Sequence, residues 1–205
     1  MRLRYDSKAK EKLELSNFLI KQTDSKIRLD KSTVLEIGMG KGEMLVELAY
    51  KNPNFKFIGL EKYETVAAKC LKRAKELDLK NFFILIEDAK NIGEIFEGKC
   101  STIWLTFSDP WPKKKHLKRR LTHKFFLDKY SEILDNNGIL KFKSDNDKLY
   151  DFSLNSLNEA NWKIIDNGTD LHSSKHSVNN ILTGYEQKWS LLGKNINYIF
   201  AMKPA

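Results

Sequence analysis

The sequence predicts an α/β protein in which one mostly parallel sheet of seven strands carries helices on both faces. Three observations lead to this fold class. Short apolar strands alternate with amphipathic helical segments, and the first strand runs into a glycine-rich turn that precedes a helix. A third observation is that two late strands follow one another with little helix between them. Such a series is typical of a Rossmann-like sheet that ends in an antiparallel hairpin.

The strands are expected where apolar runs of strand length occur. The parallel strands cover residues 33–37, 55–60, 82–86, 103–107 and 139–143, and the late pair covers 162–165 and 197–202. Helical patterns cover residues 43–50, 66–77, 125–134 and 148–160, and a turn is expected at 135–138. Residues 167–195 are polar and are predicted as a long loop, a kind of segment that often carries function.

The chain is expected to form a single domain over residues 1–205, because no repeat or low-complexity linker interrupts it. Residues 1–31 are predicted as a basic arm or helix, with Leu13, Leu15, Phe18 and Leu19 as its apolar positions. Such a segment either packs on the domain or contacts nucleic acid.

The composition favours a nucleic-acid partner, because the 205 residues carry a formal net charge of +9. The two cysteines, Cys70 and Cys100, have no paired spacing, which indicates reduced thiols rather than a disulfide framework. No apolar run approaches the roughly 18 residues of a membrane span, and the N-terminus is charged. We therefore expect a cytoplasmic protein without membrane association.

The glycine turn after the first strand indicates which cofactor the domain binds. Gly38, Gly40 and Gly42 follow Glu36 in the order E-x-G-x-G-x-G, whereas a dinucleotide site has G-x-G-x-x-G. A carboxylate at Glu36 would repel a pyrophosphate, which disfavours an NAD oxidoreductase. It would suit a ligand with an ammonium or sulfonium group, and S-adenosylmethionine carries both.

Acidic residues also end the following strands. Glu61 lies 21 residues after Gly40, where a carboxylate can accept hydrogen bonds from ribose hydroxyls. Asp88 and Asp109 end the third and fourth strands. Because the carboxyl ends of parallel strands meet at one edge of a sheet, these acids predict a shared ligand site there.

Residues 101–120 combine a candidate active site with a candidate substrate clamp. Asp109 ends an apolar strand and lies in the segment Ser108-Asp109-Pro110-Trp111-Pro112, whose prolines force the chain out of the sheet. Six fixed cations follow within the eight residues 113–120. A cationic run beside a carboxylate at a strand end is what a polyanionic substrate requires.

A metal site is not expected. His172 and His176 have a spacing that could hold a metal ion, but no third ligand accompanies them. Asp109 with Asp145 is a further carboxylate pair, and it is no better supported as a metal site.

Four motifs together resemble the bacterial tRNA (guanine-N7)-methyltransferases. They are EIGMGKG (36–42), FSDPWPKKKHLKRR (107–120), KSDN (143–146) and TGYE (183–186). The resemblance covers nearly all of the chain from about residue 33 onward, and the second motif is the most specific. It implies that a methyl group is transferred from S-adenosylmethionine to N7 of a variable-loop guanosine in tRNA, which leaves S-adenosylhomocysteine.

The resemblance also implies roles for individual residues. The residues expected to bind the cofactor are Glu36, Gly38, Gly40, Gly42, Glu61, Asp88 and Asp109, and Asp109 is also expected to be the catalytic residue. The residues expected to bind the substrate guanosine are Lys113, Asp145, Thr183, Gly184, Tyr185 and Glu186. The residues expected to bind the rest of the RNA are Lys115, His116, Lys118, Arg119 and Arg120. Gly184 stands where relatives often carry a basic residue, and the N-terminal arm is shorter than in many of them.

Methyl transfer to guanine N7 needs no obligatory base, because this nitrogen has an in-plane lone pair and no proton. The site must align the reacting atoms and oppose the positive charge that develops on the base. The Asp109 carboxylate can stabilise this positive charge while it accepts hydrogen bonds from guanine N1–H and the exocyclic amine. Asp145 and Glu186 could share the recognition of the guanine edge.

Two other function classes stay open at this point. One is a methyltransferase for exocyclic amines of RNA or DNA, since Asp109-Pro110-Trp111-Pro112 is close to the Asp/Asn-Pro-Pro-aromatic motif of those enzymes. The other is a non-catalytic RNA-binding protein on the same fold. The sequence does not decide between a monomer and a homodimer, and it does not indicate which tRNAs are used.

Overall fold

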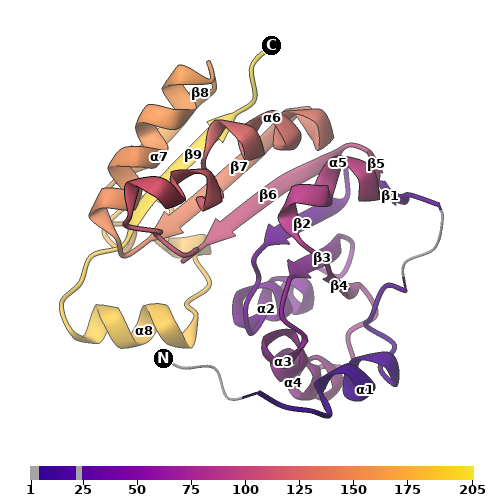
Figure 1. Ribbon diagram of the computed structural model, residues 1–205. Coiled ribbons are helices and arrows are strands. Elements are labelled where there is room, and N and C mark those ends of the chain that lie inside the picture. Colours follow the sequence, from indigo (N-terminus) through magenta and orange to yellow (C-terminus); the bar gives the residue numbers. More distant parts are fainter. Residues whose placement is uncertain (1–4, 22–24) are drawn as a thin grey trace.

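The computed structural model describes residues 5–21 and 25–205. Its central sheet has seven strands in the order β4-β3-β2-β6-β7-β9-β8 (Figure 1). The strands are β2 (Thr33–Ile37), β3 (Lys56–Glu61), β4 (Phe82–Ile86), β6 (Cys100–Thr106), β7 (Leu134–Ser144), β8 (Lys163–Gly168) and β9 (Asn197–Met202). All neighbours from β4 to β7 pair in parallel, and β9 is antiparallel to both β7 and β8. The predicted fold class is therefore confirmed.

Helices cover both faces of this sheet (Figure 1). The helices are α1 (Ala9–Glu14), α2 (Glu43–Lys51), α3 (Glu64–Ala67), α4 (Leu71–Glu76), α5 (Ile92–Ile95), α6 (Lys124–Ile133), α7 (Asp147–Glu159) and α8 (Gly184–Leu191). Short 3-10 turns are η1 (Ala68–Cys70), η2 (Ala89–Asn91), η3 (Lys114–Arg119) and η4 (Ser177–Asn179). A small parallel sheet joins β1 (Ile27–Leu29) to β5 (Phe96–Gly98).

Alternate residues of the strands enter two different apolar layers. Leu35 and Ile37 of β2 pack in the layer that α5, α6 and α7 complete, whereas Val34 lies in the layer with α1, α2 and α4. This alternation is the two-residue period of a strand that is buried on both faces. It places Glu36 on the same face of the sheet as α2.

The first described residues are part of the second layer. Leu13 of α1 and Phe18 are buried there. The segment then runs beside β4, where the Ile20 amide donates to the Ile84 carbonyl and the Ile84 amide donates to the Phe18 carbonyl, both at 2.8 Å. The basic residues Arg2 and Arg4 lie outside the described residues.

Three local predictions differ from the structure. The helix expected at 66–77 is divided into α3, η1 and α4. The turn expected at 135–138 lies within β7, where the pairing register with β6 shifts between Cys100 and Thr102. The loop expected at 167–195 contains α8, whose first turn is capped by the Thr183 hydroxyl accepting from the Glu186 amide at 3.0 Å. Thr-x-x-Glu is a known helix-start signal, so α8 could have been predicted.

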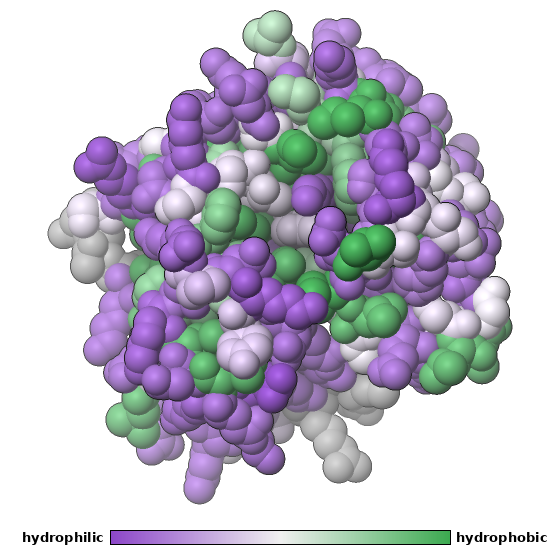
Figure 2. Space-filling view, turned by 180° about the vertical axis from the view of Figure 1, so that it is seen from behind, coloured by the Kyte–Doolittle hydropathy of each residue, from purple (hydrophilic) through white to green (hydrophobic). Residues whose placement is uncertain are grey.

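The molecular surface is largely polar. Figure 2 shows hydrophilic residues over most of the face seen from behind, with hydrophobic residues gathered in smaller patches among them. Among the described residues, no helix is both long and apolar enough to cross a membrane.

Candidate active site

The glycine turn between β2 and α2 has a backbone that only glycine adopts without strain. Gly38, Gly40 and Gly42 have φ angles of 76°, 57° and 65°, in the left-handed region. The turn is tied to the end of β3, because the Gly38 amide donates to the Leu60 carbonyl at 2.8 Å and the Gly40 amide donates to Glu61 Oε2 at 3.0 Å. Two neighbouring strand ends are thereby joined into one rigid edge.

Glu36 is a buried carboxylate with an unused oxygen. The residue is 2% exposed, and its Oε2 has no hydrogen-bond partner among the described residues. Burial raises the pKa of Glu36 to about 8, although Thr106 and the Lys143 ammonium act in the opposite direction. Buried polar groups are normally paired, so an orphaned oxygen here fits a ligand that brings its own cation. The ammonium group of S-adenosylmethionine meets that requirement.

Glu61 and Asp88 lie at the same edge, and each already holds backbone groups. Glu61 Oε1 accepts from the amides of Lys62 and Tyr63 at 2.9 and 3.0 Å. Asp88 caps η2 through the Lys90 amide and pairs with Lys62 Nζ at 2.8 Å. An ionised carboxylate has about four lone-pair sites, so both side chains retain capacity to accept from a ligand.

Asp109 is exposed, and nothing among the described residues hydrogen-bonds to its side chain. The residues on either side of it are constrained, because Phe107 and Trp111 have φ angles of 49° and 41°. L-residues pay about 1–2 kcal/mol for this conformation, and strained backbone of this kind concentrates at functional sites. Asp109 is therefore free to meet a ligand from a loop of defined shape.

Arg120 contributes to that shape. Its Nε donates to the Pro110 carbonyl at 2.9 Å and its Nη2 donates to the Trp111 carbonyl at 3.2 Å. The guanidinium also lies over the Phe152 ring of α7, 4.3 Å from the centroid. The side chain thus fastens residues 107–112, which we call the Asp109 loop, to α7.

The rest of the basic run faces solvent. Lys113, Lys115, Lys118 and Arg119 are exposed, and His116 is partly exposed. Arg119 lies 4.8 Å from the Trp111 ring centroid, and the His116 ring meets the same indole edge-on at 5.6 Å. The run forms a charged surface directly beside the Asp109 loop.

The start of α8 lies against this loop. The Tyr185 ring centroid is 5.1 Å from that of Phe107, and its hydroxyl donates to Asp145 Oδ2 at 3.0 Å. Burial and this hydrogen bond raise the pKa of Tyr185 to about 12. The Gly184 amide donates to Glu43 Oε2 at 2.6 Å, which joins α8 to the first residue of α2. The structure thus brings Asp145, Gly184 and Tyr185 together beside the start of α2.

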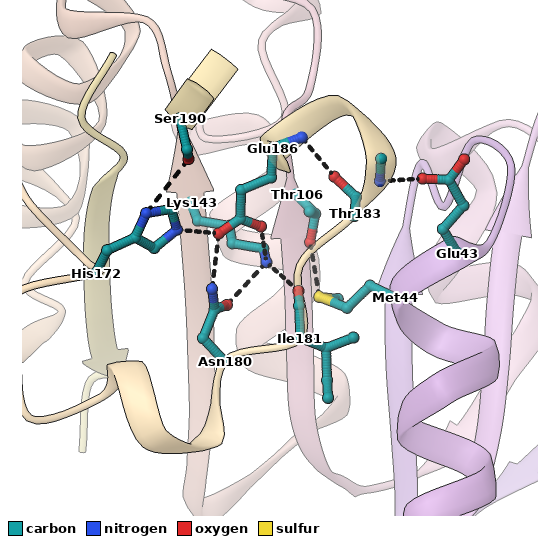
Figure 3. Close-up of polar contacts among 11 residues, drawn as sticks. Glu43, Met44, Thr106, Lys143, His172, Asn180, Ile181, Thr183, Glu186 and Ser190 are labelled. Atoms are coloured by element: carbon teal, nitrogen blue, oxygen red, sulfur yellow. Dashed lines mark hydrogen bonds and ion pairs between the residues drawn. The ribbon is translucent and has the colours of Figure 1, made fainter. Parts of the chain in front are cut away.

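Glu186 differs from the other substrate candidates because its side chain is completely buried. Its Oε2 pairs with Lys143 Nζ at 2.6 Å, and its Oε1 contacts His172 Nε2 and Asn180 Nδ2, both at 2.7 Å (Figure 3). Burial alone would raise the pKa of Glu186, but the Lys143 charge and these hydrogen bonds outweigh it and lower the pKa. Lys143 was not identified as a site residue from the sequence.

The two histidines have separate carboxylate partners. His172 meets Glu186, whereas His176 Nε2 contacts Asp166 Oδ2 at 2.8 Å. Within residues 5–21 and 25–205, no three or more His, Cys, Asp or Glu side chains come together as a metal site would require.

The chain has known relatives that are similar in sequence over nearly its whole length. A family model described as "Putative methyltransferase" matches residues 30–199. The chain is 68% identical to the tRNA (guanine-N(7)-)-methyltransferase of Mycoplasmopsis agalactiae, with 99% of each chain covered. It is 51% identical to the enzyme of that name from Mycoplasmopsis pulmonis, with 97% of each covered.

Solved structures share the fold at much lower identity. The 16S rRNA methyltransferase KamB superposes with a TM-score of 0.64 at 14% identity, covering 86% of this chain and 89% of that one. The plantazolicin methyltransferase BamL, solved with S-adenosylhomocysteine, has a TM-score of 0.56 at 11% identity and covers 85% of this chain and 77% of that one. At these identities the likeness concerns the fold alone.

Proposed function

This chain belongs to the tRNA (guanine-N7)-methyltransferase family, and we propose a role in that reaction for each part of its site. The methyl donor is S-adenosylmethionine, the acceptor is N7 of a guanine in tRNA, and we place that guanine in the variable loop. We also propose that the enzyme works in the cytoplasm, where tRNA is found.

Glu36, Glu61, Asp88 and the glycine turn form the cofactor site in this proposal. Glu36 binds the ammonium group, since its buried Oε2 is a carboxylate oxygen without a partner among the described residues. Glu61 holds the Gly40 amide and accepts from the ribose hydroxyls with its remaining lone pairs. Bound in this way, the cofactor supplies an electrophilic methyl group on sulfur.

Asp109 acts on the guanine. Its free carboxylate accepts from guanine N1–H and the exocyclic amine, which orients N7, and its negative charge opposes the imidazolium charge of the transition state. No proton must leave N7, so Asp109 serves as an electrostatic and orienting group. The observation that supports this most is an unpaired, exposed Asp109 at the same sheet edge as the orphaned Glu36.

The proposal assigns five further residues to binding of the substrate guanosine. They are Lys113, Asp145, Thr183, Gly184 and Tyr185. Tyr185 donates a hydrogen bond to Asp145, and its ring packs against that of Phe107, two residues from Asp109. We assign Lys113 to the approaching guanosine, since it is exposed at the end of the same loop.

The exposed basic run binds the tRNA backbone in this account. Lys115, His116, Lys118 and Arg119 can reach phosphates, and such contacts dominate affinity for nucleic acids. Exposing a stacked guanine costs a few kcal/mol in comparable enzymes, and these contacts would offset that cost. Arg120 has a different role, because its guanidinium is already bound to the Pro110 and Trp111 carbonyls.

The direct test is to incubate the protein with labelled S-adenosylmethionine and unmodified tRNA, and then to identify and map the labelled nucleoside. The proposal predicts N7-methylguanosine at one variable-loop position. Label on an exocyclic amine would favour the alternative methyltransferase, and tRNA binding without label would favour a non-catalytic RNA-binding protein.

A further inference from the structure

Lys143 is a buried cation that no role described so far requires. It lies near the carboxyl end of β7 with a fully buried side chain. Its ammonium donates to Glu186 Oε2 at 2.6 Å, to the Ile181 carbonyl at 2.9 Å and to Asn180 Oδ1 at 3.0 Å (Figure 3). A lysine ammonium has three N–H donors, so all of them are used. All three acceptors belong to one short stretch, residues 180–186, which we call the α8 entry segment.

The buried Lys143–Glu186 ion pair is expected to contribute little to the free energy of folding. Removing two opposite charges from water often cancels the gain from pairing them, and well-packed apolar residues stabilise a core equally well. Buried ionic groups can instead impose one geometry on the chain, because a displaced partner leaves a charge unpaired. Glu186 is fixed further by His172 and Asn180. The cluster therefore holds the α8 entry segment in one position on the sheet.

The same lysine also contacts the Asp109 loop. Its carbonyl accepts from the Phe107 amide at 2.9 Å, and its ammonium lies 5.6 Å from the Phe107 ring centroid. Tyr185, one residue before Glu186, packs against that ring. One residue of β7 thus joins the loop that carries Asp109 to the helix that carries Tyr185.

We propose that Lys143 is a positioning residue for methyl transfer: it anchors the α8 entry segment so that Tyr185 and Asp145 face the Asp109 loop. In this role Glu186 serves as the anchor point of the segment, with its oxygens turned toward the protein interior. The inference rests on the proposed function of this site. It predicts that the loss of Lys143 affects the chemical step more than the binding of either substrate.

The test compares Lys143→Met with a matched control, Lys141→Met. Lys141 lies two residues earlier on the same face of β7, over the Trp104 and Phe200 rings at 5.1 and 5.3 Å. Its ammonium makes no hydrogen bond or ion pair with the α8 entry segment, all of which lies within the described residues. Because Lys143→Met alone leaves Glu186 buried without its cation, the double variant Lys143→Met/Glu186→Gln is made alongside it. Glu186→Gln alone keeps an oxygen that can accept from Lys143.

We expect the double variant to fold and to bind S-adenosylhomocysteine and tRNA as the unmodified protein does, with the same salt dependence. Its kcat should fall by roughly 10- to 100-fold, since small misplacements near reacting atoms cost that much. Amide hydrogen exchange across residues 180–190 should become faster. Lys141→Met should retain the kcat of the unmodified protein. The kcat of Glu186→Gln should fall by less than that of the double variant.

Two results would overturn the inference. One is a folded double variant with unchanged kcat. The other is a loss of activity that follows a loss of cofactor affinity, which would mean that Lys143 acts through the charge of Glu36. Failure of the unmodified protein to form N7-methylguanosine would instead contradict the proposed function, so the two failures are distinguishable.

Discussion

Arg120 donates a hydrogen bond from Nε to the carbonyl oxygen of Pro110 at 2.9 Å, although the basic run to which it belongs otherwise faces solvent. The residue is only 7% exposed. Its neighbour Arg119 has the same side chain but is exposed and lies against Trp111. Adjacent arginines therefore make different contacts, Arg120 with backbone carbonyls of the Asp109 loop and Arg119 with the Trp111 ring.

Replacing Arg120 should affect turnover rather than RNA affinity. Arg120→Gln removes the guanidinium that fixes the Pro110 and Trp111 carbonyls, so we expect kcat to fall while the salt dependence of tRNA binding stays unchanged. Arg119→Gln is the matched control, and it should weaken tRNA binding and reduce that salt dependence. Binding titrations over a range of salt concentrations, with single-turnover rates, separate the two effects. A reduced salt dependence in Arg120→Gln would assign this side chain to RNA instead.

Neutralising the exposed cations together should reduce affinity for tRNA without affecting the cofactor. In the combined Lys115→Gln/Lys118→Gln/Arg119→Gln variant, each lost phosphate contact should lower the slope of log affinity against log salt by about 0.7–0.9. Calorimetry with S-adenosylhomocysteine should give unchanged binding. If the slope stays the same and cofactor affinity falls, the run is structural.

Cofactor binding should release a proton from Glu36 near neutral pH. In the free protein the pKa of Glu36 is raised to about 8, so the group is neutral at pH 7, and an ammonium ligand favours its ionised form. Affinity for S-adenosylhomocysteine should thus increase as the pH rises toward 8. Calorimetry in buffers of different ionisation enthalpy measures the number of protons released on binding. Glu36→Gln should abolish this proton release. Binding without proton release in the unmodified protein would contradict this assignment.

The same group should make the free protein less stable at higher pH. A carboxyl whose folded pKa lies above its ordinary value of 4.5 contributes stability at low pH, and it loses that contribution as the pH rises from about 4.5 to about 8. Denaturant unfolding of the cofactor-free protein should show this trend, and Glu36→Gln should reduce it. An equal pH dependence in both proteins would assign the trend to other groups.

The sheet and its acidic edge could be predicted from sequence because both depend on local patterns. Strand-length apolar runs locate the parallel strands, and parallel strands bring their carboxyl ends to one edge. Glu36, Glu61 and Asp88 therefore come together without any tertiary information. The orphaned oxygen of Glu36 also has a signal in the sequence, since a carboxylate inside an apolar strand requires a partner.

The roles of Lys143 and Arg120 depend on tertiary contacts that no local pattern reveals. Lys143 meets Glu186 across 43 residues of sequence, so neither residue indicates the pair on its own. Arg120 is indistinguishable in sequence from the exposed cations before it, and only its tertiary contacts with the Pro110 and Trp111 carbonyls and the Phe152 ring show that it is buried. The helix α8 begins at Thr183-x-x-Glu186, a pattern that the family resemblance assigns to substrate binding and that also caps a helix.

The most direct measurement for this account is the single-turnover rate of Asp109→Asn with tRNA and S-adenosylmethionine. If Asp109 only shaped its turn, the change would be nearly harmless, since asparagine fits turns about as well as aspartate. As the group that opposes the developing imidazolium charge, its loss should lower the rate by roughly 10²–10³, with an unchanged melting temperature. Asp78→Asn, at an exposed turn before β4, serves as the control and should be fully active. A well-folded Asp109→Asn protein with near-normal methyl transfer would contradict the role given to Asp109.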